Sequence, residues 1–339
     1  REMAPAKAHR DMYVINCRLD DEASKTGPLA SGVPGALAAY DLALQKHGML
    51  KLADLLRPAA DLAEKGFPID EVYERKLKGT ADRIKKFAES AATLLRPDGT
   101  PLKKGDMLVQ KNLAATYRAV ADNGIAWFYR GPFAEKTAAW MKDNGGIMTT
   151  EDFANYKSVE REPIRTKYRG YDLISMPPPS SGGVHVAQIL NILEHFPIRH
   201  FRDSSRVHVM TEAMKLAFAD RAYWLGDPDF ANVPRGLVDP AYAADLAKKI
   251  DLDHTTSVPN HNNPPNWEGD IFGKHTTHLS AADAEGNWVA LTQTINTAFG
   301  SKVMIPGTGV LLNNQMDDFS VQPGVPNAFK LIGGEANAV

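Results

Sequence analysis

The sequence contains a single cysteine in 339 residues, and this scarcity limits how the protein can be stabilised. Cys17 cannot form a disulfide within the chain, so a fold that depends on internal disulfides is excluded. Hydrophobic residues make up 43% of the chain and charged residues 24%, a composition that allows a large buried core without such bonds. A reducing compartment and an export route that does not rely on disulfides are both compatible with this composition.

Long hydrophobic runs and an excess of basic charge are also missing. No apolar run approaches the roughly 18 residues of a membrane-spanning helix. The formal net charge is -2 and no basic stripe alternates with aromatic residues, so we expect no nucleic-acid partner. The glycine spacings of a phosphate-binding loop and of a dinucleotide fingerprint are absent, which argues against nucleotide binding.

Most of the chain has the pattern of helices separated by glycine and proline. Through the first three quarters, apolar residues return at steps of three and four. Within residues 52–66, Pro58 predicts two short helices, the second beginning at the proline. Residues 251–273 are rich in asparagine and proline, which predicts an exposed linker.

Two strands are expected after this linker. Residues 277–283 and 287–294 mix β-branched and aromatic residues with small ones and flank the turn at residues 284–286. Such runs on either side of a short turn with a glycine predict a β-hairpin.

A histidine stands on each side of two threonines at the start of this hairpin. His275 and His278 would point to opposite faces of a strand, and no third ligand stands at a suitable spacing, so no metal is expected. By pattern alone, Thr276 and Thr277 are explained as strand residues with high β-propensity.

An unusually polar segment follows the apolar residues 309–312. Residues 313–320 read N-N-Q-M-D-D-F-S, and their amide and carboxylate oxygens would suit the ammonium group of a ligand. A turn rich in asparagine and aspartate explains the same pattern equally well.

Several long motifs, in order along the chain, resemble the gamma-glutamyltranspeptidase family. They include R-E-M-A-P-A-K-A, L-I-S-M-P-P-P-S-S-G-G-V-H, T-T-H-L-S and L-L-N-N-Q-M-D-D-F-S-V-Q-P-G-V-P-N. The resemblance implies an α/β (α+β) fold class, the four-layer αββα sandwich of N-terminal-nucleophile hydrolases. It also implies a precursor that cuts itself into a large subunit, here residues 1–275, and a small subunit that starts with residues 276–339.

The resemblance assigns the nucleophile to Thr276, which cleavage of the His275–Thr276 bond would release. A threonine hydroxyl needs a base, and in this class the base is the α-amino group of the same residue. That amine has a reference pKa of roughly 7.7 to 8.0 and exists only after the cut. Thr294 matches the second threonine, which positions the nucleophile. The resemblance implies no cofactor.

The implied substrates are γ-glutamyl amides such as glutathione, with transfer to water or to an amino-acid or peptide acceptor. Asn296, Gln315 and Asp318 match the residues that hold the glutamyl α-amino group. Arg1 matches the arginine that pairs with the α-carboxylate through its planar guanidinium group.

Some features depart from the family pattern or fall outside the chain. Phe329 stands where a lid tyrosine is usual and Lys330 where a small residue is usual, so we expect a looser gate and an altered lid backbone. The chain resembles a family member truncated at both ends, and the family's oxyanion-hole glycines would lie beyond Val339. The isolated chain is therefore expected to be inactive. A periplasmic or secreted location is expected by analogy with bacterial relatives.

Rival functions remain open at this point. A related N-terminal-nucleophile acylase or a capsule-type transferase would share Thr276 but not the glutamyl preference that Asp318 provides. A catalytically dead homologue that serves as a binding protein would show no cleavage at the junction.

Overall fold

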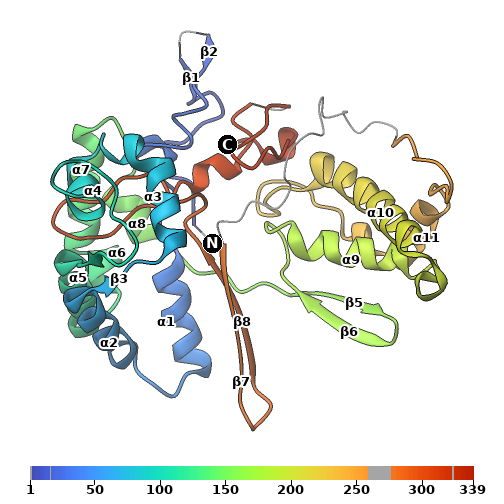
Figure 1. The fold of residues 1–339 in the computed structure, drawn as a ribbon, viewed down its shortest axis with the longest axis horizontal. Coiled ribbons are helices and arrows are strands. Elements are labelled where there is room, and N and C mark those ends of the chain that lie inside the picture. The colour runs from blue at the N-terminus through green and yellow to red at the C-terminus, as the bar shows by residue number, and fades with distance from the viewer. Residues whose placement is uncertain (1, 16, 259–275, 323) are drawn as a thin grey trace. The chain divides into compact units, whose positions relative to one another are not determined.

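A computed structural model describes residues 2–15, 17–258, 276–322 and 324–339 (Figure 1). The chain divides into two compact units. Unit 1 comprises residues 1–158 and 272–318, and unit 2 comprises residues 159–271 and 319–339. The predicted cleavage junction does not separate these units, because unit 1 contains residues from both sides of it. The predicted linker lies mostly outside the described residues.

Unit 1 consists mainly of helices. Its helices are η1 (Pro28–Ala30), α1 (Ala36–His47), α2 (Leu52–Lys65), α3 (Glu71–Ile84), α4 (Ala88–Leu94), α5 (Lys111–Asn123), α6 (Ala126–Tyr129), α7 (Pro132–Asp143), α8 (Thr150–Asn155) and η4 (Gln315–Asp318). Its strands pair antiparallel as β1 (Val14–Ile15) with β2 (Arg18–Leu19), β3 (Phe67–Pro68) with β4 (Met107–Leu108), and β7 (Thr276–Ala282) with β8 (Trp288–Thr294).

Helix α2 corrects the prediction of two short helices around Pro58. It runs unbroken through the proline, although the ring removes one backbone donor from the helix interior. Ala60 and Ala63 on this helix are buried against Ala114 of α5. This packing outweighs the local preference of proline to begin a helix, since tertiary contacts override intrinsic propensity.

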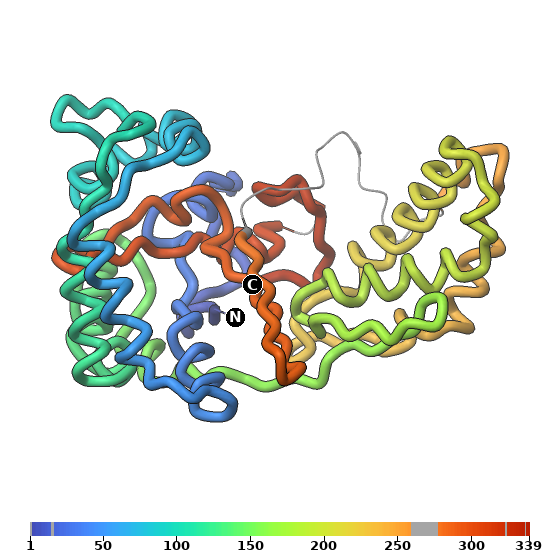
Figure 2. Tube along the Cα trace, turned by 60° about the horizontal axis from the view of Figure 1, so that its bottom comes forward, coloured from blue at the N-terminus to red at the C-terminus, as the bar shows by residue number. Residues whose placement is uncertain are grey.

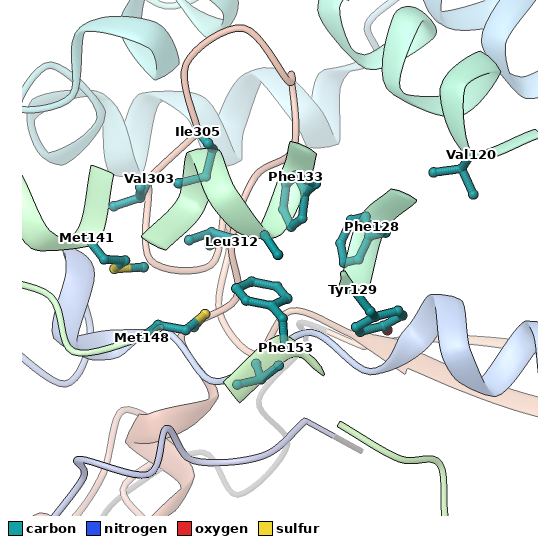
Figure 3. Packing of buried hydrophobic residues seen from close by; sticks show 12 residues of the cluster. Val120, Phe128, Tyr129, Phe133, Met141, Met148, Phe153, Val303, Ile305 and Leu312 are labelled. Carbon is teal, nitrogen blue, oxygen red and sulfur yellow. The ribbon is translucent and has the colours of Figure 1, made fainter. Parts of the chain in front are cut away.

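The main core of unit 1 joins its helices to residues 296–318, here called the polar loop. Phe128 and Phe133 stack with their ring centroids 3.9 Å apart, and Phe153 meets Phe133 edge-on. Three apolar side chains of the polar loop enter this cluster, as Figure 3 shows. They are Val303, Ile305 and Leu312. Apolar packing therefore anchors the polar loop, and its polar residues 313–318 follow directly after the buried Leu312.

The predicted hairpin is confirmed. β7 and β8 form a long two-stranded ribbon that leaves the helices of unit 1 (Figure 1), and the chain then turns back into them as the polar loop (Figure 2). Its side chains from Thr277 onward are mostly exposed. The ladder of backbone hydrogen bonds, rather than a covered face, holds the two strands together.

Unit 2 contains a second hairpin and a group of packed helices. Its elements are β5 (Ile164–Tyr168), β6 (Tyr171–Ser175), α9 (Gly182–Leu193), η2 (Ile198–His200), α10 (Asp203–Trp224), η3 (Arg235–Val238), α11 (Pro240–Ala247) and η5 (Glu335–Asn337). Ile192, Val209 and Leu246 bring α9, α10 and α11 together in one apolar cluster. Buried Asp220 accepts hydrogen bonds from Gln188 and from the Tyr242 hydroxyl.

The predicted mixture of helices and strands is confirmed. Within the described ranges, the strands pair two by two in separate antiparallel sheets. None of the helices in these ranges is both long enough and apolar enough to cross a membrane.

Candidate active site

The hairpin brings Thr276 and Thr294 opposite each other. Their backbones pair at the open end of the ladder, whereas Ala282 pairs with Trp288 beside the turn. Directly paired residues in an antiparallel sheet have Cα atoms roughly 4.5 to 5.5 Å apart. The backbone of the predicted nucleophile therefore lies beside the threonine predicted to position it. The predicted residues His275 and Arg1, and the side chain of Thr276, lie outside the described part of the chain.

Thr294 is connected directly to Asn296. Its Oγ1 accepts a hydrogen bond from the Asn296 backbone N–H at 2.9 Å. Asn296 has a φ of 74°, a left-handed conformation that asparagine tolerates better than most residues. This conformation turns the chain from the exposed hairpin into the interior, where Asn296 is only 3% exposed.

Asn296 is in turn held by Asn314, eighteen residues further along the chain. Asn296 Nδ2 donates to the Asn314 carbonyl oxygen at 2.9 Å. Asn314 Oδ1 accepts from the Thr297 backbone N–H and from its hydroxyl, both at 3.0 Å. These bonds place Asn296 next to the segment that carries Gln315 and Asp318.

Gln315 and Asp318 form a pair on the short helix η4. Gln315 Nε2 donates to Asp318 Oδ2 at 2.6 Å, which holds an exposed carboxylate at the edge of a buried amide. Gln315 Oε1 is buried, and no donor among the described residues reaches it. A buried acceptor beside a carboxylate suits a ligand with several N–H donors and a positive charge, such as an ammonium group.

The sequence analysis missed the residues that hold this segment in place. Asn313 bonds to both backbone groups of Gly32, accepting from its N–H at 3.0 Å and donating to its carbonyl at 2.9 Å. Asp317 is fully buried and accepts from the Ser24 hydroxyl at 2.7 Å. Burial, together with the charge of Asp317, raises the pKa of the Tyr13 hydroxyl. The motif indicated these residue types, but not which of two adjacent aspartates turns inward.

His278 is occupied within the hairpin. Its ring nitrogens contact Thr292 Oγ1 at 2.8 Å and Ser280 Oγ at 3.1 Å. These contacts give it a structural role on the ladder.

The predicted lid residues lie in unit 2, in a tight turn. Asn327 Oδ1 accepts from the backbone N–H groups of Phe329 and Leu331, at 3.0 and 3.1 Å. Lys330 between them has a φ of 59°. This is a left-handed conformation, which glycine adopts at less cost than lysine because it has no Cβ.

Known proteins resemble this chain in sequence and in fold. A sequence model described as gamma-glutamyltranspeptidase matches residues 1–339. The chain belongs to the gamma-glutamyltranspeptidase family. The glutathione hydrolase proenzyme of Escherichia coli (strain K12) is 46% identical over 343 residues, which cover all of this chain and 59% of that relative. The chain thus spans less than two thirds of the length of this family member.

Solved structures of the family and of its neighbours share the fold. The gamma-glutamyltranspeptidase of Helicobacter pylori is 39% identical with a TM-score of 0.73, over 76% of this chain and 74% of that one. A cephalosporin acylase from Bacillus halodurans is 27% identical with a TM-score of 0.79, over 98% of this chain and 61% of that one. These likenesses confirm the predicted fold class, that of the N-terminal-nucleophile hydrolases.

Proposed function

We propose that the protein to which this chain belongs cleaves γ-glutamyl amides such as glutathione and passes the glutamyl group to water or to an amino-acid or peptide acceptor. The pair formed by Gln315 and Asp318 carries this proposal. A buried amide oxygen that no donor among the described residues reaches lies beside a carboxylate, as the ammonium of a glutamyl group requires. Family membership and the name of the Escherichia coli relative, a glutathione hydrolase proenzyme, support the same substrate class.

Activation would begin with cleavage of the His275–Thr276 bond. The Thr276 hydroxyl attacks the His275 carbonyl carbon, the peptide C–N bond breaks, and an ester forms between the two residues. Water then hydrolyses this ester, which leaves a carboxylate on His275 and a free α-amino group on Thr276. The new amine is a base suited to accept the Thr276 hydroxyl proton near neutral pH.

Catalysis would use the same oxygen a second time. Thr276 attacks the γ-carbonyl of the substrate, the amine leaves with a proton, and the glutamyl group remains on Thr276 as an ester. Water or an acceptor amine then takes the glutamyl group. Thr294, paired with Thr276 across the hairpin, would position the nucleophile.

Substrate recognition would involve both charged ends of the glutamyl group. Asn296, Gln315 and Asp318 would hold the α-amino group, and the Arg1 guanidinium would pair with the α-carboxylate. Cleavage would yield a large subunit ending at His275 and a small subunit beginning at Thr276. By analogy with bacterial relatives, we propose a periplasmic or secreted location, which cell fractionation would test.

A related acylase is the second candidate, because the cephalosporin acylase matches 98% of this chain. The two functions differ in their need for the α-amino group. Substitution Asp318→Ala would abolish a preference for γ-glutamyl over glutaryl substrates only if the proposed function is right.

The deciding experiment is intact mass spectrometry of the full-length protein over a time course, with Thr276→Ala as control. We expect two fragments that meet at His275–Thr276, and a single uncut chain in the variant. An uncut chain in both would instead indicate a catalytically inactive homologue.

A further inference from the structure

Lys302 is a charged residue buried inside the polar loop. Its side chain is part of a residue only 2% exposed, and its ammonium donates to Gly300 O at 2.6 Å, Thr297 Oγ1 at 3.2 Å and Lys25 O at 3.3 Å. An ammonium group has three donors and no acceptor, so these bonds use its full capacity. A buried charge is costly unless it is fully hydrogen-bonded, so this arrangement makes the burial of Lys302 possible.

The charges around Lys302 leave it able to carry its proton at neutral pH. Burial, with a smaller contribution from Arg83 on α3, lowers its pKa to about 8. Glu22 and Asp317 act in the opposite direction. The group therefore remains mostly an ammonium donor near pH 7.

The ammonium determines how the Thr297 hydroxyl is oriented. Because Lys302 can only donate, Thr297 Oγ1 must accept from it and direct its own proton elsewhere. Asn314 Oδ1 lies 3.0 Å from that hydroxyl, whereas Gly300 O lies at 3.5 Å and already accepts from Lys302. The hydroxyl proton thus goes to Asn314 Oδ1, which also accepts from the Thr297 backbone N–H at 3.0 Å, so both donors of Thr297 hold the Asn314 amide.

Asn314 connects these hydrogen bonds to the candidate site. Its backbone carbonyl accepts from Asn296 Nδ2, and the Asn296 backbone N–H donates to Thr294 Oγ1. One chain of hydrogen bonds therefore runs from Lys302 through Thr297 and Asn314 to Asn296.

We propose that Lys302 is a positioning residue that, through Thr297 and Asn314, fixes Asn296 where the substrate's α-amino group binds. This inference rests on the proposed function, because it requires Asn296 to contact the glutamyl group. The polar loop would then form the amino-group site only when a cation occupies its interior.

The test compares Lys302→Met with Lys142→Met, a change at an exposed lysine near the end of α7, in the full-length protein. Self-cleavage is followed by intact mass, and KM and kcat are measured with a chromogenic γ-glutamyl anilide. For Lys302→Met we expect the junction to be cut, KM to rise roughly tenfold and kcat to stay within about threefold. Lys142→Met should leave all three unchanged.

Thr297→Val breaks the same chain without removing a buried charge. It should raise KM as Lys302→Met does, and the double variant should be no worse than either single variant, because both act through one link. Thr297→Val also tests the proposed positioning role if Lys302→Met does not fold. Variants that are cut and show the KM of the unchanged protein, or additive losses in the double variant, would overturn the proposal.

Failure of the proposed function would look different. The unchanged protein would then stay uncut and inactive, and the link would be judged by hydrogen exchange at the Thr297 N–H. Faster exchange in Lys302→Met would support the positioning role, and unchanged exchange would overturn it.

Discussion

The hairpin β7–β8 and the polar loop are adjacent in sequence but are held in opposite ways. Leu279 and Trp288 on the hairpin are 59% and 80% exposed, whereas Ile305 and Leu312 in the polar loop are fully buried. The hairpin depends on its own ladder, and the loop depends on contacts with residues far away in the sequence. In the 339-residue chain, loss of an apolar side chain should therefore cost less stability in the hairpin than in the polar loop.

The largest effect is expected from a comparison of two leucines. In the 339-residue chain, Leu312→Ala should lower the free energy of unfolding by about 3 to 4 kcal/mol, since it removes a side chain from the core cluster. Leu279→Ala on the hairpin should change it by no more than about 0.5 kcal/mol. Urea unfolding of both variants measures these free energies. Equal losses would contradict the difference between the hairpin and the polar loop.

The second test compares two aspartates by activity. In the full-length protein, Asp318→Asn should raise KM for a γ-glutamyl anilide roughly a hundredfold, because the partner of the ammonium loses its charge. Asp283, which accepts from Asn287 at the turn of the hairpin, provides the control. Asp283→Asn should leave KM within about twofold. An equal effect of both changes would show that charge near the site acts without specificity.

Two glycines with positive φ provide the third test. A Cβ on Gly300 would lie 2.2 Å from the Leu312 carbonyl oxygen, whereas one on Gly286 in the hairpin turn would meet nothing within 4 Å. Gly300→Ala should therefore destabilise the 339-residue chain by roughly 2 to 3 kcal/mol and Gly286→Ala by about 1 kcal/mol. Thermal unfolding of the two variants measures the difference between these losses. Equal losses would mean that the polar loop can shift to make room for the added methyl group.

The smallest expected effect is a pH dependence that belongs to the polar loop. The unfolded chain keeps the Lys302 proton up to a pKa near 10.5, and the folded chain loses it near 8. Between these values the unfolded state binds more protons, so the free energy of unfolding should rise by about 1 to 2 kcal/mol from pH 8 to roughly pH 9.5.

The control for this rise is Lys302→Met in the same chain. Residues 276–294 of the hairpin contain no lysine, so the variant should lose the slope while the hairpin is unchanged. Urea unfolding at several pH values measures it. If the variant shows a slope of the same size, the pH dependence comes from titratable groups other than Lys302.

The sequence predicts the hairpin better than it predicts the loop, for a physical reason. Strand propensity and a turn glycine are local signals, and they were enough for residues 277–294. The loop depends on partners such as Gly32 for Asn313 and Ser24 for Asp317, which are 281 and 293 residues away. No local pattern contains such a pairing.

Two further residues show the same limit. Pro58 was expected to begin the second of two short helices, but packing between α2 and α5 keeps one unbroken helix. A lysine normally lies on the surface. Lys302 is buried nonetheless, because its ammonium donates to the backbone carbonyls of Gly300 and Lys25. Family motifs predicted four site residues in the hairpin and the polar loop, namely Thr294, Asn296, Gln315 and Asp318. The hydrogen bonds among the loop residues show how the chain brings these segments together.

Unit 1 is built from both sides of the proposed cut, which bears on what the cut can release. The buried side chains of Val303, Ile305 and Leu312 stay within a cluster whose other members precede the junction. Cleavage before Thr276 would therefore alter the covalent connectivity of the chain and leave its core intact. The lifetime of the resulting complex would be set by the rate at which this shared core opens, as it is for the dissociation of an obligate dimer.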